Sequence, residues 1–190
     1  MTKGRMEAFS DGVIAIIITI MVLELRVPHG ADLAALRPLA PVFLSYVLSF
    51  VFLGIYWNNH HHMLHATERI DGTVLWANLH LLFWLSLIPF ATGWMGENHF
   101  AALPIAVYGM VLLLAAAAWL ILQSAILKRQ GPNSKLAAAL GRDWKGKVSA
   151  ASYVAAVALA FVNSWIALGL YVFVALLWLV PDRRIERLDR

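Results

Sequence analysis

The sequence has 190 residues, of which 61% are hydrophobic and 14% charged, and its mean hydropathy is +0.72. Soluble domains have an apolar share nearer half, so this composition excludes a soluble globule and indicates an integral membrane protein. The chain has no cysteine, which excludes disulfides and thiolate metal sites.

Six apolar stretches, taken in chain order, have about the length that crosses a hydrocarbon core of roughly 30 Å. We therefore predict an all-α fold, a single transmembrane domain over residues 1–190. The six helices are expected at 9–25, 39–63, 73–95, 101–127, 148–162 and 165–180. The last two are expected as a hairpin that turns at Asn163 and Ser164, because residues 148–180 carry no charge yet are too long for one crossing. Gly169 predicts close helix approach near the end of the chain.

The basic residues predict the orientation. If the N-terminus is cytoplasmic, thirteen of the 15 lysines and arginines lie on the cytoplasmic side and only Arg26 and Arg37 lie outside. This asymmetry follows the positive-inside rule and predicts a multi-pass protein of the cell membrane with both termini in the cytoplasm. The net charge of +4 thus reflects topology, and no nucleic-acid partner is expected.

The first helix carries polar residues that are costly near a membrane and therefore indicate a functional site. Its start contains Arg5, Ser10 and Asp11, and its middle contains a single threonine, Thr19. Two interpretations of Thr19 stay open. Its hydroxyl either bonds its own i−4 carbonyl on a lipid-facing helix or belongs to a functional face.

The charged start of the first helix favours a functional face, because Arg5 and Asp11 would be costly if they faced lipid. At about 100° per residue, Ile16, Thr19, Ile20 and Leu23 share one stripe. The polar start of the helix needs partners, and candidates lie near the same predicted membrane depth on the second and third helices. We expect a buried network of Arg5, Ser10, Asp11, Asn78 and one or two histidines.

Several motifs resemble the transmembrane protein 175 family, the endolysosomal potassium channels and their bacterial relatives. The most specific is R-x-x-x-F-S-D-G-V at residues 5–13, followed by A-I-x-x-T ending at Thr19. Supporting matches are G-I-x-W-x-x-H-H at residues 54–61, W-x-N-L at 76–79 and L-x-P-F-x-T at 87–92.

The resemblance implies a six-helix subunit of a homotetramer, with the first helices lining a central cation pore in the lipid bilayer. By position, Ile16, Ile20 and Leu23 would form hydrophobic layers and Thr19 a ring of hydroxyls. The implied permeant ion is potassium among monovalent cations, with no cofactor, no bound metal and no enzyme activity. The implied motif network comprises Arg5, Phe9, Ser10, Asp11, His60, His61, Trp76 and Asn78.

One alternative is a proton-coupled or metal-ion transporter that uses Asp11 and the histidine cluster. His61 and His65 are spaced i and i+4, and Glu68 or Asp71 could complete a metal site. No inverted repeat of the kind found in carriers is visible, and the chain lacks the G-x-S-x-G and H-E-x-x-H motifs of hydrolases.

Glu24 lies at the predicted outer end of the first helix, and two interpretations of it stay open. A ring of Glu24 carboxylates would concentrate cations at the pore mouth. Alternatively, Glu24 pairs with Arg26 in the following loop.

Overall fold

The structure is a computed structural model that describes residues 2–67, 70–131 and 144–179. Within these ranges all regular secondary structure is helical, which confirms the predicted all-α class. The helices are α1 (Lys3–Leu23), the 3-10 helix η1 (Leu33–Leu39), α2 (Ala40–His65), α3 (Gly72–Ser86), α4 (Ile88–Glu97), α5 (Ala102–Gln130), α7 (Trp144–Leu159) and α8 (Ser164–Leu179).

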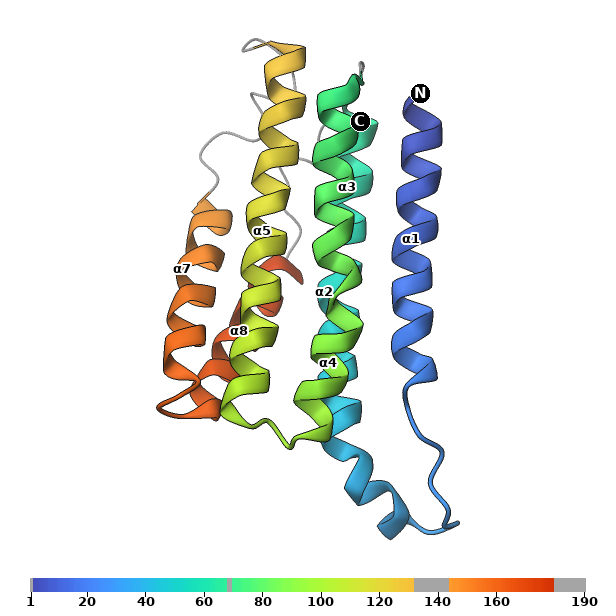
Figure 1. The fold of residues 1–190 in the computed structure, drawn as a ribbon, viewed down its shortest axis with the longest axis vertical. Coiled ribbons are helices and arrows are strands. Elements are labelled where there is room, and N and C mark those ends of the chain that lie inside the picture. Colours follow the sequence, from blue (N-terminus) through green and yellow to red (C-terminus); the bar gives the residue numbers. More distant parts are fainter. Residues whose placement is uncertain (1, 68–69, 132–143, 180–190) are drawn as a thin grey trace.

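These helices form six rods that run alternately up and down (Figure 1). The third rod was predicted as one helix over 73–95 but consists of α3 and α4, which meet at Leu87. The break has a local cause, because Pro89 has no backbone N–H to continue the ladder of hydrogen bonds. Four rods are long and apolar enough to cross a membrane: α1, η1 with α2, α3 with α4, and α5.

The first helix differs from its predicted bounds, since α1 begins at Lys3 rather than at residue 9 and ends at Leu23. The charged start of the chain is therefore part of the helix. The fifth helix begins at Trp144 and ends at Leu159, before the turn that was predicted. Asn163 accepts a hydrogen bond from the Trp165 backbone amide at 2.9 Å and caps α8, whose predicted end at residue 180 lies outside the described residues.

A hydrogen-bonded group of hydroxyls joins the rods at the centre of the bundle. The Ser49 hydroxyl lies 2.6 Å from that of Thr92 and 3.0 Å from that of Tyr108. Tyr171 from α8 donates to the Ile105 carbonyl at 3.1 Å. These side chains are buried, and their mutual bonds offset the cost of removing hydroxyls from water.

Close packing between α5 and α8 depends on Gly109 rather than on Gly169. A Cβ added at Gly109 would lie 1.9 Å from the Tyr171 hydroxyl oxygen, whereas one at Gly169 would have no heavy atom within 4 Å. The glycine predicted from the sequence is thus not the one that allows the helices to approach.

The helix α1 lies at the edge of the bundle (Figure 1) and packs against α2, α3 and α4. Its buried residues, spaced three or four apart, are Met6, Ser10, Ile14, Ile17 and Met21. This periodicity leaves the opposite face of α1 without a packing partner in the described part of the chain.

Candidate pore helix and its polar anchor

The unpartnered face of α1 carries the stripe predicted from the sequence. Ile16 is 59% exposed, Ile20 is 43% exposed and Leu23 is 77% exposed. Apolar side chains so exposed along one helix face mark a surface that contacts lipid, another subunit or a narrow pore.

Thr19 lies on the same exposed face. Its hydroxyl donates to the Ala15 carbonyl at 2.8 Å, which is the i−4 bond expected for a threonine inside a helix. Because the hydroxyl proton is used in this bond, the lone pairs of the oxygen remain as acceptors. The Thr19 oxygen can therefore coordinate a cation through its lone pairs.

A polar anchor lies on the buried side of the first turns of α1. The Asn78 side-chain amide donates to the Ser10 hydroxyl oxygen at 2.9 Å, and Ser10 donates to the Met6 carbonyl at 2.8 Å. The Asn78 carbonyl oxygen lies 2.7 Å from Nε2 of His60. All three side chains are at most 1% exposed. The anchor therefore joins α1, α2 and α3 with bonds that have no competition from water.

The pattern of donors assigns the proton of His60. Because the Asn78 amide nitrogen donates to Ser10, its oxygen must accept, so Nε2 of His60 carries the proton. Nδ1 of His60 is buried and has no hydrogen-bond partner among the described residues. The Nε2–H of His60 therefore holds the Asn78 side chain in place.

A second pair of contacts joins α1 to α2 beside the anchor. The Trp57 indole nitrogen donates to Asp11 at 3.0 Å, and Glu7 lies 3.3 Å from Nδ1 of His61. The rings of Trp57 and His61 stack with centroids 6.3 Å apart. Asp11 thus bonds Trp57. Of the two histidines predicted for the network, His60 joins the anchor, whereas His61 pairs with Glu7, which was not a predicted partner.

Three predicted network residues lie apart from these bonds. Phe9 is 50% exposed, Trp76 is 75% exposed, and Arg5 is exposed on the face of α1 that carries Ile16. Among the described residues of the chain, Arg5 makes no hydrogen bond to the anchor. Within one chain its guanidinium is exposed, because Arg5 lies on the helix face opposite Ser10.

The histidine run offers no metal site within the part of the chain that the structure describes. The rings of His61 and His65 have centroids 6.2 Å apart, but no group of three or more His, Asp or Glu side chains gathers there in a metal-binding arrangement. Glu68 lies outside the described residues. Asp71 instead caps α3 through the Val74 amide and pairs with Arg129.

At the opposite end of α1, Glu24 lies near Glu97, the last residue of α4. Arg26 binds Glu97 at the end of α4 at 2.9 Å, so the partner of Arg26 is Glu97 rather than Glu24. Partial burial, together with the neighbouring Glu97 carboxylate, raises the pKa of Glu24. These residues border a recess of about 590 Å³ that also includes Leu23.

Known proteins match this chain along its length. Residues 5–89 match the family model described as the endosomal/lysosomal potassium channel TMEM175. A potassium channel from Chryseobacterium sp. (strain P1-3) is 54% identical over 98% of this chain and 97% of its own. A human protein named the endosomal/lysosomal proton channel TMEM175 is 36% identical over 44% of this chain and 19% of its own.

A solved structure has the same fold. The crystal structure of a lysosomal potassium-selective channel TMEM175 homolog from Chamaesiphon minutus superposes with a TM-score of 0.82 at 28% identity. The match covers 95% of this chain and 97% of that one. The similarity thus includes α7 and α8, which lie beyond the residues that the family model matches.

Proposed function

From the premise that this chain belongs to the TMEM175 family, we propose that it forms a potassium-preferring cation channel as a homotetramer whose α1 helices line a central pore. The family resemblance inferred from the motif at residues 5–13 is confirmed by the matches. The relatives are channels, which also agrees with the prediction that the chain is not an enzyme.

The observation that carries the proposal is the unpartnered face of α1. That face combines exposed isoleucine and leucine side chains with one hydroxyl, Thr19, and it begins at the charged Arg5. It also contains Gly12, where an added Cβ would have no heavy atom within 4 Å. Small residues allow neighbouring helices to approach closely in a membrane, so this face suits packing around a symmetry axis.

The side chains on this face suggest how ions are selected. Rings of Ile16, Ile20 and Leu23 offer no lone pairs, so an ion in their constriction keeps its water or sheds part of it. The Thr19 oxygens, with their protons bonded to Ala15, would replace part of the lost hydration. Potassium loses water at a lower cost than sodium. The pore would therefore prefer potassium over sodium without a selectivity filter of backbone carbonyls.

The polar anchor keeps α1 in position while ions pass. Ser10 and Asp11 bond α3 and α2 respectively, on the side of α1 turned away from the proposed pore. These bonds fix the rotation of α1 about its own axis and therefore the side chains that face the pore.

The described basic residues support a cytoplasmic N-terminus. Lys3 and Arg5 at the start of α1 lie at the same end of the bundle as the basic end of α5 (Figure 1). Arg26 and Arg37 lie at the other end. Arg69 and the basic residues within 132–143 and 180–190 lie outside the described residues. We place the channel in the cell membrane on this asymmetry.

The second candidate is a protein that moves protons through Asp11 and the histidine cluster, since the human relative is named a proton channel. The hydrogen bonds of the anchor argue against a proton path through it. The Asn78 amide separates His60 from Ser10, and the Ser10 proton is donated to the Met6 carbonyl. A side-chain amide does not exchange a proton in the way an imidazole or a carboxylate does.

The proposal is tested by measuring the mass of the detergent-solubilised particle and potassium flux into liposomes that contain it. We expect a particle of four chains, with potassium flux that exceeds sodium flux and shows single-channel steps. A monomer without flux would contradict the channel. Saturable flux that requires a pH gradient would instead favour the transporter.

A further inference from the structure

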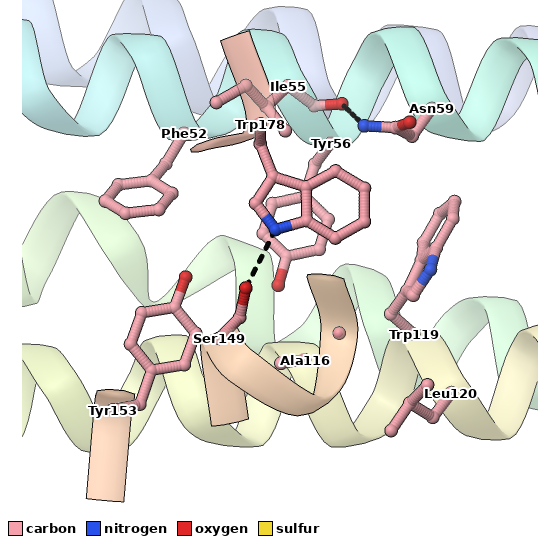
Figure 2. Close-up of a pocket in the computed structure, with 11 residues that line it drawn as sticks. Phe52, Ile55, Tyr56, Asn59, Ala116, Trp119, Leu120, Ser149, Tyr153 and Trp178 are labelled. Carbon is pink, nitrogen blue, oxygen red and sulfur yellow. Dashed lines mark hydrogen bonds between the residues drawn. The ribbon is translucent and has the colours of Figure 1, made fainter. Parts of the chain in front are cut away.

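A narrow cleft lies between α2, α5, α7 and α8, and none of its described lining residues belongs to α1. It encloses about 50 Å³, which is room for a few water molecules or for one organic molecule of about three to five non-hydrogen atoms. Five aromatic side chains border it (Figure 2), namely Phe52, Tyr56, Trp119, Tyr153 and Trp178. We call this space the hairpin cleft, because α7 and α8 form part of its wall.

The walls of the hairpin cleft are mainly aromatic. The rings of Tyr56 and Trp119 meet edge to face with centroids 6.2 Å apart, and those of Phe52 and Tyr153 lie 6.3 Å apart. None of the described lining residues is an aspartate, glutamate, lysine, arginine or histidine. An occupant is therefore expected to be neutral, because a charge would have no counter-charge in this lining.

Some polar groups of the lining already have hydrogen-bond partners. The Trp178 indole donates to the Ser149 hydroxyl oxygen at 2.8 Å, and Ser149 donates to the Lys145 carbonyl at 2.8 Å. The Asn59 amide donates to the Ile55 carbonyl at 2.8 Å, as Figure 2 shows. These bonds are complete without an occupant of the cleft.

Three other polar groups of the lining have no hydrogen-bond partner among the described residues. They are the hydroxyls of Tyr56 and Tyr153 and the indole N–H of Trp119. Tyr153 is only 3% exposed, and Figure 2 shows both tyrosine hydroxyls pointing into the space between α2 and α7. A buried hydroxyl without a partner costs free energy, so these groups indicate an occupant that donates and accepts hydrogen bonds.

A hydroxyl group with a short hydrocarbon part suits this lining better than water alone. A water molecule in the cleft would turn part of its bonding capacity toward the rings of Phe52 and Trp119, where few polar partners exist. A short-chain alcohol places its oxygen beside the tyrosine hydroxyls and its carbon atoms against those rings. Small-molecule sites commonly combine apolar walls with a few polar groups in this way.

We propose that the hairpin cleft binds one short-chain alcohol, whose hydroxyl bonds Tyr56 and Tyr153. A tyrosine hydroxyl can donate or accept, so one tyrosine donates to the alcohol oxygen and the other accepts the alcohol proton. The carbon atoms of the alcohol lie against the rings of Phe52 and Trp119. This binding does not depend on ion conduction, and its test needs no ion flux.

The test uses the full-length chain in phosphatidylcholine vesicles with bromoethanol as the probe alcohol, because bromine quenches tryptophan fluorescence at short range. Bromopropane has nearly the same shape but carries a methyl group in place of the hydroxyl. We expect quenching by bromoethanol to contain a saturating component, and quenching by bromopropane to rise only gradually with its concentration in the membrane. The Trp119→Phe, Trp178→Phe double variant should lose the saturating component, although six of the eight tryptophans remain.

The tyrosine hydroxyls are tested by a variant that keeps both rings. The Tyr56→Phe, Tyr153→Phe double variant should raise the half-saturating concentration of bromoethanol about tenfold, because two hydrogen bonds to the alcohol are lost. Tyr46→Phe removes a hydroxyl from the same helix outside the cleft and should keep the parent value. Ala116→Phe fills the cleft and should abolish saturation, whereas Ala117→Phe, at an exposed position outside the lining, should retain it.

Three results would overturn the proposal. Gradual quenching by both probes would leave the cleft to water alone. Equal saturation by bromoethanol and bromopropane would show that the hydroxyl is not recognised. An unchanged half-saturating concentration in the tyrosine double variant would place the alcohol elsewhere.

Discussion

Asn78 and Ser10, 68 positions apart in the chain, are joined by a 2.9 Å hydrogen bond in which the Asn78 amide donates to the Ser10 hydroxyl oxygen. Since both side chains are buried, this bond ties α1 to α3 without competition from water. His60 bonds the other end of the Asn78 side chain and so extends the tie to α2.

Replacing Asn78 with Ala should destabilise the subunit by about 1–3 kcal/mol, because it leaves the buried Nε2–H of His60 without an acceptor. The thermal unfolding midpoint in detergent measures this loss. Leu79→Ala, at the exposed neighbouring position, is the control and should change the midpoint little. Equal effects of the two variants would show that the Asn78 bonds contribute no stability.

Gly109→Ala should also be destabilising, by about 1–3 kcal/mol, because its Cβ would collide with the Tyr171 hydroxyl and force α5 and α8 apart. Unfolding in detergent again provides the measurement, with Gly169→Ala as the control that has open space. Adding Tyr171→Phe to Gly109→Ala should recover part of the loss. A variant as stable as the parent would rule out the close approach at Gly109.

Thr19→Val should keep a conducting pore with a lower preference for potassium over sodium. Loss of a contact worth about 1 kcal/mol corresponds to about a fivefold fall in the permeability ratio. Bi-ionic recordings measure this ratio, and Thr19→Ser should keep the parent value because it retains the hydroxyl. An unchanged ratio in Thr19→Val would remove Thr19 from the selectivity mechanism.

Conductance should fall as the pH on the Glu24 side is lowered, and the fall should begin above the usual carboxyl range. Burial and Glu97 raise the pKa of Glu24, so its negative charge is lost earlier on acidification than that of an ordinary glutamate. Without that charge, fewer cations gather at the mouth of the pore. Glu24→Gln should remove this part of the pH dependence, and an identical pH profile in that variant would assign it to another group.

Hydropathy and spacing predicted most of the fold and the main face of the candidate site. The apolar runs predicted the helices because a membrane span must satisfy its own backbone hydrogen bonds. The helical period placed Ile16 and Leu23 on one face, and that face is exposed in the subunit. Asn78 and Ser10 were predicted partners because both are polar at a similar depth.

Other features depend on contacts between distant segments, which spacing along one helix does not reveal. The pairing of Arg26 with Glu97 spans 71 positions. Gly109 matters because Tyr171 lies against it, and nothing near Gly109 in the sequence indicates a tyrosine from another helix. Arg5 lies on the exposed face of α1 rather than beside Ser10, because the cost of a charge in lipid does not indicate the helix face on which it lies.

Cysteine accessibility along α1 tests the central claim most directly, because the chain has no cysteine of its own. Leu23→Cys, in liposomes with measured potassium flux, should react rapidly with a charged methanethiosulfonate reagent added on the Glu24 side, and its flux should fall. Leu176→Cys, exposed on α8, should react slowly and keep its flux. If Leu23→Cys reacts as slowly as Leu176→Cys and conducts normally after treatment, α1 faces lipid and does not line the pore.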